Sequence, residues 1–143
     1  MPLVMQSHAH HADAVDWFER VPDQSVALCR LTQAGMLRTL TSVAIFNAEA
    51  LTMRQAWDVY DQLAASLQMG PWLDEPQTLE DRWRQLTSRP SPSSKLWSDA
   101  ILAAFAIESN ATLVTFDRGF RQFAGLHCQI LGMEHTTDSL GSG

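Results

Sequence analysis

The sequence predicts an α/β fold in which helices cover both faces of a mostly parallel sheet. Short apolar runs typical of buried strands alternate along the chain with segments whose apolar residues recur at helical spacing. The chain has 143 residues, of which 45% are hydrophobic, and contains no internal repeat. This length and composition favour a single domain with a substantial core.

The composition excludes several classes of function. The net charge of −6 argues against a broad phosphate-binding surface, so a nucleic-acid role requires a local site. No apolar run approaches the roughly 20 residues of a membrane helix, and no secretory leader pattern opens the chain. Cys29 and Cys128 are expected to be free thiols. We therefore expect a cytoplasmic protein with no membrane association.

The first half of the chain predicts two helices around a strand. Apolar residues at helical spacing indicate a helix over 8–21, and the apolar run 25–29 indicates a buried strand. A second helix is expected over 32–41, with Gly35 allowing another backbone to approach closely. Residues 42–51 read as a loop.

Two capping signals mark the helices that follow. Thr52 with Gln55 predicts the start of a long helix, and Thr78 with Asp81 predicts the start of another. Between them, residues 72–73 suit a short edge strand.

The last third of the chain predicts a buried helix followed by two strands. After a Pro- and Ser-rich loop at 89–94, residues 97–109 are apolar on nearly every side, and Asn110 is a good terminator. Strands are expected over 112–116 and 128–131.

Asp99 and Asp117 are predicted to lie at one edge of the sheet. Asp117 directly follows the strand 112–116, and Asp99 lies in the first turn of the preceding antiparallel helix. Two converging carboxylates repel each other unless a cation lies between them, and hard oxygen ligands suit Mg²⁺ or Mn²⁺. The alternative is structural, with Asp99 capping its helix and Asp117 starting a turn.

Three stretches resemble the PIN-domain ribonucleases, and within them the VapC-type toxins of bacterial toxin–antitoxin pairs. They are CRLTQAGMLRTLT at 29–41, WSDAILAAFA at 97–106 and ATLVTFDRGF at 111–120, and SHAHHA at 7–12 is similar to the family's entry to its first helix. The resemblance implies a three-layer α/β/α domain with a central, mostly parallel sheet. It also implies a metal-dependent endoribonuclease.

The resemblance assigns roles to individual residues. Asp99 and Asp117 correspond to metal-binding catalytic residues for Mg²⁺ or Mn²⁺. Gln33 stands where the family usually has a glutamate. It keeps a carbonyl oxygen but loses the charge, so it would hold an ion less tightly.

The same resemblance makes Thr115, Arg118 and Arg38 candidates for ordering the site or contacting RNA. It implies a VapB-like antitoxin as partner, and we expect a homodimer.

The chain departs from the family at its beginning. The family starts with a central strand that ends in an aspartate, whereas Met1 lies in what resembles the first helix. We expect residues 1–134 to form a PIN-like domain lacking that strand, and 135–143 to be a flexible polar tail. A missed upstream start, a truncated chain, or residues 1–5 or a partner chain filling the gap would each account for this.

Two rival functions stay open on the sequence alone. A catalytically impaired PIN fragment would act only as a partner-binding module. A receiver-like phospho-acceptor domain needs a lysine after a late strand, but Lys95 is the only lysine.

Other polar and aromatic groups have ordinary structural explanations. The five tryptophans (17, 57, 72, 83, 97) are expected mostly in the core, with base stacking as the alternative. Arg82, Arg84 and Arg89 suit a solvated helix face or RNA contact. His8, His10 and His11 lack the spacing of a helical metal pair.

Overall fold

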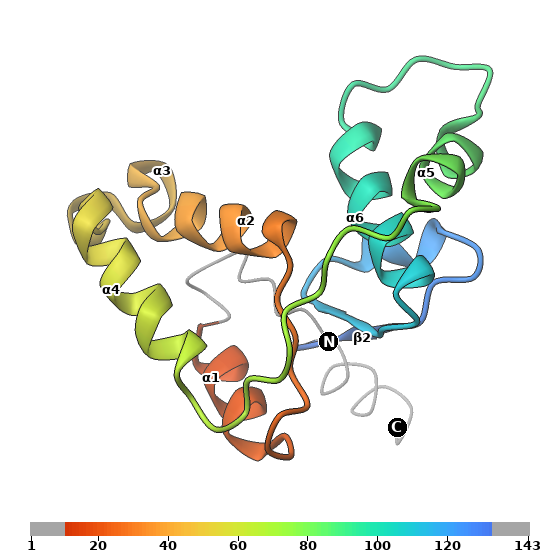
Figure 1. Ribbon diagram of the computed structural model, residues 1–143. Helices are drawn as coiled ribbons and strands as arrows, with labels where there is room; N and C mark the ends of the chain where they lie inside the picture. The colour runs from red at the N-terminus through yellow and green to blue at the C-terminus, as the bar shows by residue number, and fades with distance from the viewer. Residues whose placement is uncertain (1–10, 133–143) are drawn as a thin grey trace, which may run out of the picture.

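The computed structural model describes residues 11–132, and Figure 1 gives the arrangement of their elements. The predictions made for residues 1–10 and 133–143, which include the missing first strand, His8, His10 and the polar tail, lie outside the described residues. In chain order the elements are α1 (His11–Arg20), α2 (Arg30–Leu40), α3 (Val43–Phe46), η2 (Asn47–Glu49), α4 (Met53–Ala64), α5 (Leu79–Thr87), α6 (Leu96–Glu108), β1 (Leu113–Thr115), η3 (Arg118–Gln122) and β2 (Cys128–Ile130).

The sheet is parallel, as predicted. Within the described residues, β1 pairs with β2 in parallel, with Leu113 opposite Cys128 and Thr115 opposite Ile130. The predicted strand at 25–29 is extended, but among residues 11–132 its regular pairing consists of one parallel bridge between Val26 and Met69.

That ladder stops at the segment that carries Pro71. Val26 donates to Gln68 O (3.0 Å) and accepts from Gly70 N (2.6 Å). A regular parallel ladder would next bond residue 72 to Leu28, but the bond comes from Leu73 N to Leu28 O at 2.9 Å. The segment carrying Pro71 has therefore slipped by one residue, which takes the predicted 72–73 strand out of regular pairing.

Leu28 and Cys29 show how helices come to lie on both sides of this extended segment. Leu28 belongs to a cluster with Met36 of α2 and Tyr60 of α4. Cys29 packs with Phe105 of α6 and with Leu79. Successive residues of an extended chain point to opposite faces, so α2 and α4 cover one face while α5 and α6 cover the other (Figure 1).

Most helix ends follow the predicted signals, with one exception. Thr52 and Gln55 form the predicted capping box of α4, with Gln55 N to Thr52 Oγ1 at 3.1 Å. Thr78 precedes α5 but its side chain makes no cap bond, and it donates instead to Glu108 Oε1 of α6 at 2.6 Å. The capping box with Asp81 was therefore wrong, because a carboxylate on a neighbouring helix binds the Thr78 hydroxyl.

The region 42–51 is more ordered than expected. It forms α3 and η2, and Ser42 caps α3 by accepting from Ile45 N at 3.3 Å. Gly35 also differs from expectation, because a Cβ built on it would meet nothing within 4 Å. Within residues 11–132, no backbone of another segment therefore lies close to Gly35.

The expectation that the tryptophans lie mostly in the core was wrong for three of the five. Trp57, Trp72 and Trp97 are 49%, 38% and 55% exposed, respectively. Trp17 and Trp83 are half-buried. The two cysteines are free thiols, as predicted.

Candidate metal and RNA site at the end of β1

Asp117 is held in place from both sides of its own backbone. Its N–H donates to Thr115 Oγ1 at 3.1 Å, and its Oδ1 accepts from Gly119 N at 2.8 Å, which caps η3. Thr115 is fully buried in β1. The carboxylate is therefore fixed just beyond the end of the strand, in a half-buried position.

Asp99 lies in the first turn of α6 and interacts with Asp117. Burial raises the pKa of the Asp99 carboxyl, the negative charge of Asp117 raises this pKa further, and Lys95 lowers it. The structure thus brings the two predicted aspartates together, although they come from different elements. A cation between them would relieve their repulsion.

The pair fits a hard divalent cation. Mg²⁺ keeps several waters in proteins and is bound through one or two carboxylates together with substrate phosphates. Over residues 11–132, no group of three or more His, Cys, Asp or Glu side chains gathers in a way that could hold a metal. Among these residues, the carboxylates that could hold such an ion together at this edge are Asp99 and Asp117.

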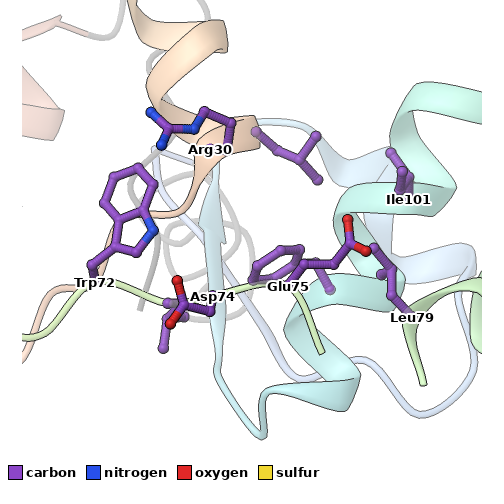
Figure 2. Close-up of a pocket in the computed structure, with 9 residues that line it drawn as sticks. Arg30, Trp72, Asp74, Glu75, Leu79 and Ile101 are labelled. Carbon is purple, nitrogen blue, oxygen red and sulfur yellow. The ribbon is translucent and has the colours of Figure 1, made fainter. Parts of the chain in front are cut away.

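Gln33 makes its side-chain hydrogen bond with Arg30. It is buried in α2, and its Oε1 accepts from Arg30 Nη1 at 2.5 Å. The guanidinium of Arg30 lies 4.8 Å from the ring centre of Trp72 (Figure 2). The carbonyl oxygen expected to help with the ion is therefore bound by an arginine, and the amide Nε2 remains as a donor.

The three predicted RNA-contacting residues occupy different environments. Arg118 follows Asp117 directly and is exposed, and Arg38 is exposed in the last turn of α2. Thr115 has no exposed surface. Its hydroxyl serves the backbone of Asp117, so this placement favours ordering the site over touching RNA.

The arginines of α5 and the following loop are paired with neighbours. Arg82 Nε bonds Glu108 at 2.9 Å, Arg84 Nε bonds Glu80 at 2.9 Å, and Arg89 donates to Gln122 at 2.9 Å. Such pairing favours the solvated helix face over RNA contact for this cluster.

Arg30 and Trp72 were not among the predicted site residues. The position of Arg30, three residues before Gln33 on the same helix, was a usable signal, since side chains at that spacing meet. Trp72 carried no comparable signal, because its contact with Arg30 joins segments that are distant in sequence.

Comparison with known proteins gives consistent results. The PIN domain family pattern matches residues 3–126. Ribonuclease VapC41 of Mycobacterium tuberculosis (strain CDC 1551 / Oshkosh) is 35% identical over 135 residues, covering 92% of each chain. VapC ribonuclease Mb2897 of Mycobacterium bovis is 34% identical over 121 residues, covering 81% of this chain and 79% of its own.

A solved structure supports the three-layer α/β/α fold. The crystal structure of VapBC2 from Rickettsia felis, bound to a DNA fragment from their promoter, aligns with a TM-score of 0.62. The alignment covers 87% of this chain and 89% of that chain at 15% identity. Within the described residues, no helix is long and apolar enough to cross a membrane.

Proposed function

The chain belongs to the PIN-domain family and, within it, to the VapC-type ribonuclease toxins, and we propose on this basis that it hydrolyses RNA phosphodiesters with Mg²⁺ or Mn²⁺ at Asp99 and Asp117. The observation that carries the proposal is the electrostatic contact between these two carboxylates. A carboxylate such as Asp99, whose pKa is raised by burial and by a neighbouring carboxylate, is unfavourable in its charged form unless a cation lies beside it or its function requires it.

The residues of the site would have distinct roles in this reaction. A divalent ion held by Asp99 and Asp117 would supply Lewis-acid activation of water and neutralise charge on the phosphate. Thr115 and Gly119 fix Asp117, as their hydrogen bonds of 3.1 and 2.8 Å to it indicate. Arg118, which is exposed and follows Asp117 directly, would bind a phosphate oxygen and so set the position of the RNA strand.

Gln33 and Arg38 have supporting roles in this proposal. Because Gln33 Oε1 accepts from Arg30, its Nε2 is the group left to donate to a phosphate oxygen or a water. Arg38, exposed on the same helix, would contact the RNA backbone further along.

The partners follow from the relatives and from charge. The Rickettsia felis structure is of VapBC2, and we propose a VapB-like antitoxin for this chain. A net charge of −6 suits a basic inhibitory segment. The exposed apolar side chains of Val43, Met53 and Trp57 would serve in a homodimer. We place the protein in the cytoplasm, where its RNA substrate is.

The second candidate is a partner-binding module without activity. Two observations favour it, namely that Gln33 is neutral and that the described residues offer two metal-binding carboxylates rather than three. The receiver-like alternative has no such support, because the family and the curated relatives both point to PIN ribonucleases.

RNA cleavage separates the two candidates. The purified chain is incubated with single-stranded RNA and MnCl₂, alongside Asp99→Asn, Asp117→Asn and the exposed control Asp58→Asn of α4. We expect cleavage by the chain and by Asp58→Asn, loss of it with EDTA and in both site variants, and inhibition by the antitoxin. Cleavage at the same rate by Asp117→Asn would reject the site, and binding of antitoxin without any cleavage would favour the module.

A further inference from the structure

A small cavity lies where α2 begins, between the segment 72–75 and α6. Its volume is about 270 Å³, and it is outside the aspartate pair described above. Figure 2 shows Arg30 over Trp72 on one side with Asp74 nearer to them, and the carboxylate of Glu75 beside Leu79 and Ile101 on the other side. The cavity thus combines an aromatic ring, a cation, two acids and an apolar wall.

The cavity adjoins the proposed site through Arg30. One N–H of the guanidinium donates to Gln33 Oε1 at 2.5 Å, while the guanidinium is stacked over Trp72 at 4.8 Å. Leu73 N bonds Leu28 O at 2.9 Å, which fixes the segment 72–75 at the end of the extended run 25–29.

Arg30 has donors to spare for a ligand. An arginine carries five N–H groups in a planar fork, and Gln33 accepts from one of its nitrogens. Among residues 11–132, no salt bridge joins Arg30 to Asp74, Glu75 or any other carboxylate. A cation held in place by stacking and by Gln33, yet not neutralised, is suited to recognise acceptor atoms.

The two carboxylates supply the opposite kind of contact. Asp74 and Glu75 are exposed and line the same cavity as the guanidinium. When ionised they accept hydrogen bonds and cannot donate them. They also disfavour a phosphate group in the cavity itself, because like charges repel.

A guanine base satisfies these groups together. Its O6 and N7 accept from a forked arginine, its N1–H and amino group donate to a carboxylate, and its ring stacks on an aromatic face. Adenine and the pyrimidines lack that combination of two adjacent acceptors and two adjacent donors. A cavity of about 270 Å³ is just below the usual range of ligand pockets, which suits one planar base.

We infer that this cavity binds a guanine of the RNA substrate and so helps to select where the RNA is cut. The inference rests on the proposed ribonuclease function and deepens it by naming a base. Trp72 stacks on the base, the free N–H groups of Arg30 bind O6 and N7, and Asp74 or Glu75 accepts from the Watson–Crick edge. Gln33 holds Arg30 in the orientation that this requires.

Nucleotide binding tests the inference without any need for cleavage. The dissociation constants of guanosine 5′-monophosphate and adenosine 5′-monophosphate are measured by calorimetry for the chain, for Trp72→Ala, and for the double variant Asp74→Asn/Glu75→Gln. Trp57→Ala is the matched control, since Trp57 is 49% exposed on α4 and away from the cavity. Thermal melts establish that each variant is folded, and Trp72→Phe tests whether an aromatic ring suffices.

We expect the guanine nucleotide to bind about tenfold more tightly than the adenine nucleotide, because one bidentate contact to a base edge is worth that much discrimination. The double variant should lose this preference. Trp72→Ala should weaken both nucleotides about tenfold by removing the stacking platform, while Trp72→Phe and Trp57→Ala retain binding. Equal affinity for the two nucleotides, or unchanged binding in Trp72→Ala, would overturn the inference.

A second pair of measurements separates this inference from the proposed function. Asp117→Asn should lose cleavage and keep the guanine preference. If the chain selects the guanine nucleotide but cuts no RNA, the ribonuclease proposal fails and the cavity assignment stands. If the double variant loses affinity for an arginine-rich peptide but not for the guanine nucleotide, the cavity serves a protein partner and the inference is overturned.

Discussion

Asp117 lies close enough to Asp99 that its charge adds to the effect of burial and raises the pKa of the Asp99 carboxyl. The two residues are positioned by different elements of the structure. Asp99 is in the first turn of α6, whereas Asp117 is fixed by its own turn beyond β1 through Gly119. The two carboxylates repel each other in the folded protein, and a divalent cation between them would relieve this repulsion. The effect of the pair can therefore be measured through the free energy of unfolding as well as through activity.

Asp117→Asn should stabilise the metal-free protein and remove its response to metal. Asparagine keeps an oxygen that can accept from Gly119 N, so the turn survives while the repulsion with Asp99 is lost. For the unsubstituted chain, MnCl₂ at one hundred times its dissociation constant should add about 2.7 kcal/mol to the free energy of unfolding. Thermal melts with and without MnCl₂ measure both effects. An equal rise of Tm in Asp117→Asn would show that the ion binds elsewhere.

Glu108 should contribute to the acid limb of the stability curve. The hydrogen bond from Thr78, then that from Arg82, lowers the pKa of the Glu108 carboxyl below its ordinary 4.5. A group whose pKa is lower in the folded state stabilises the fold above the unfolded pKa, and this contribution is lost as the pH falls through the folded pKa.

Glu108→Gln should therefore reduce stability at neutral pH and flatten its fall below pH 4.5. Urea unfolding at a series of pH values measures this. Glu80→Gln makes the same charge change at an exposed helical pair with Arg84 and should alter the curve little. Parallel acid limbs for Glu108→Gln and the unsubstituted chain would contradict the assignment.

Alanine substitutions at two glycines should act in opposite directions. A Cβ at Gly70 would lie 2.3 Å from the backbone oxygen of Gln24, so the contact between the segments 24–26 and 67–70 must open. We expect a loss of about 1–3 kcal/mol, as for other overpacked positions. Gly35 has open space around it within α2, and alanine there should add about 0.5–1 kcal/mol. The midpoints of urea denaturation report both, and destabilisation by Gly35→Ala would contradict this account of α2.

Thr115 should matter through Asp117 rather than through RNA. Thr115→Val keeps the shape of a fully buried side chain but removes the acceptor of the Asp117 N–H bond. Leaving that donor unpaired should cost about 1–3 kcal/mol, and RNA cleavage should fall because Asp117 is no longer fixed. Thr115→Ser retains the hydroxyl and should keep most of the activity. If Thr115→Val unfolded at the same urea concentration as the unsubstituted chain, the hydrogen bond would be unimportant.

Local signals in the sequence were sufficient for much of the fold. The capping box at Thr52 and Gln55 involves residues three apart, and the terminator Asn110 adopts φ 53° at the end of α6. The apolar run before Asp117 predicts β1 because burial in a parallel sheet demands such a run. In each case the interaction that decides the structure lies within a few residues of the signal.

Contacts between segments distant in sequence could not be predicted from such local signals. In a capping box the Thr78 hydroxyl would accept from a backbone N–H of α5, but it donates instead to the carboxylate of Glu108 on α6. Trp72 is a large aromatic residue of the kind expected in a core, yet it remains partly exposed and stacks with Arg30. Both outcomes depend on which helices become neighbours, and this is set by packing of the whole chain.

The sequence by itself determined the order of elements, the family and the two aspartates at the end of β1 and the start of α6. Periodicity, capping and motif spacing are local properties, so they can be recognised from the sequence without a three-dimensional structure. The tertiary structure alone decided that Asp117 raises the pKa of Asp99, that Arg30 stacks over Trp72, and that a cavity forms beside Trp72. These are relations between groups far apart in sequence, and their energies depend on distances that only the packed fold provides.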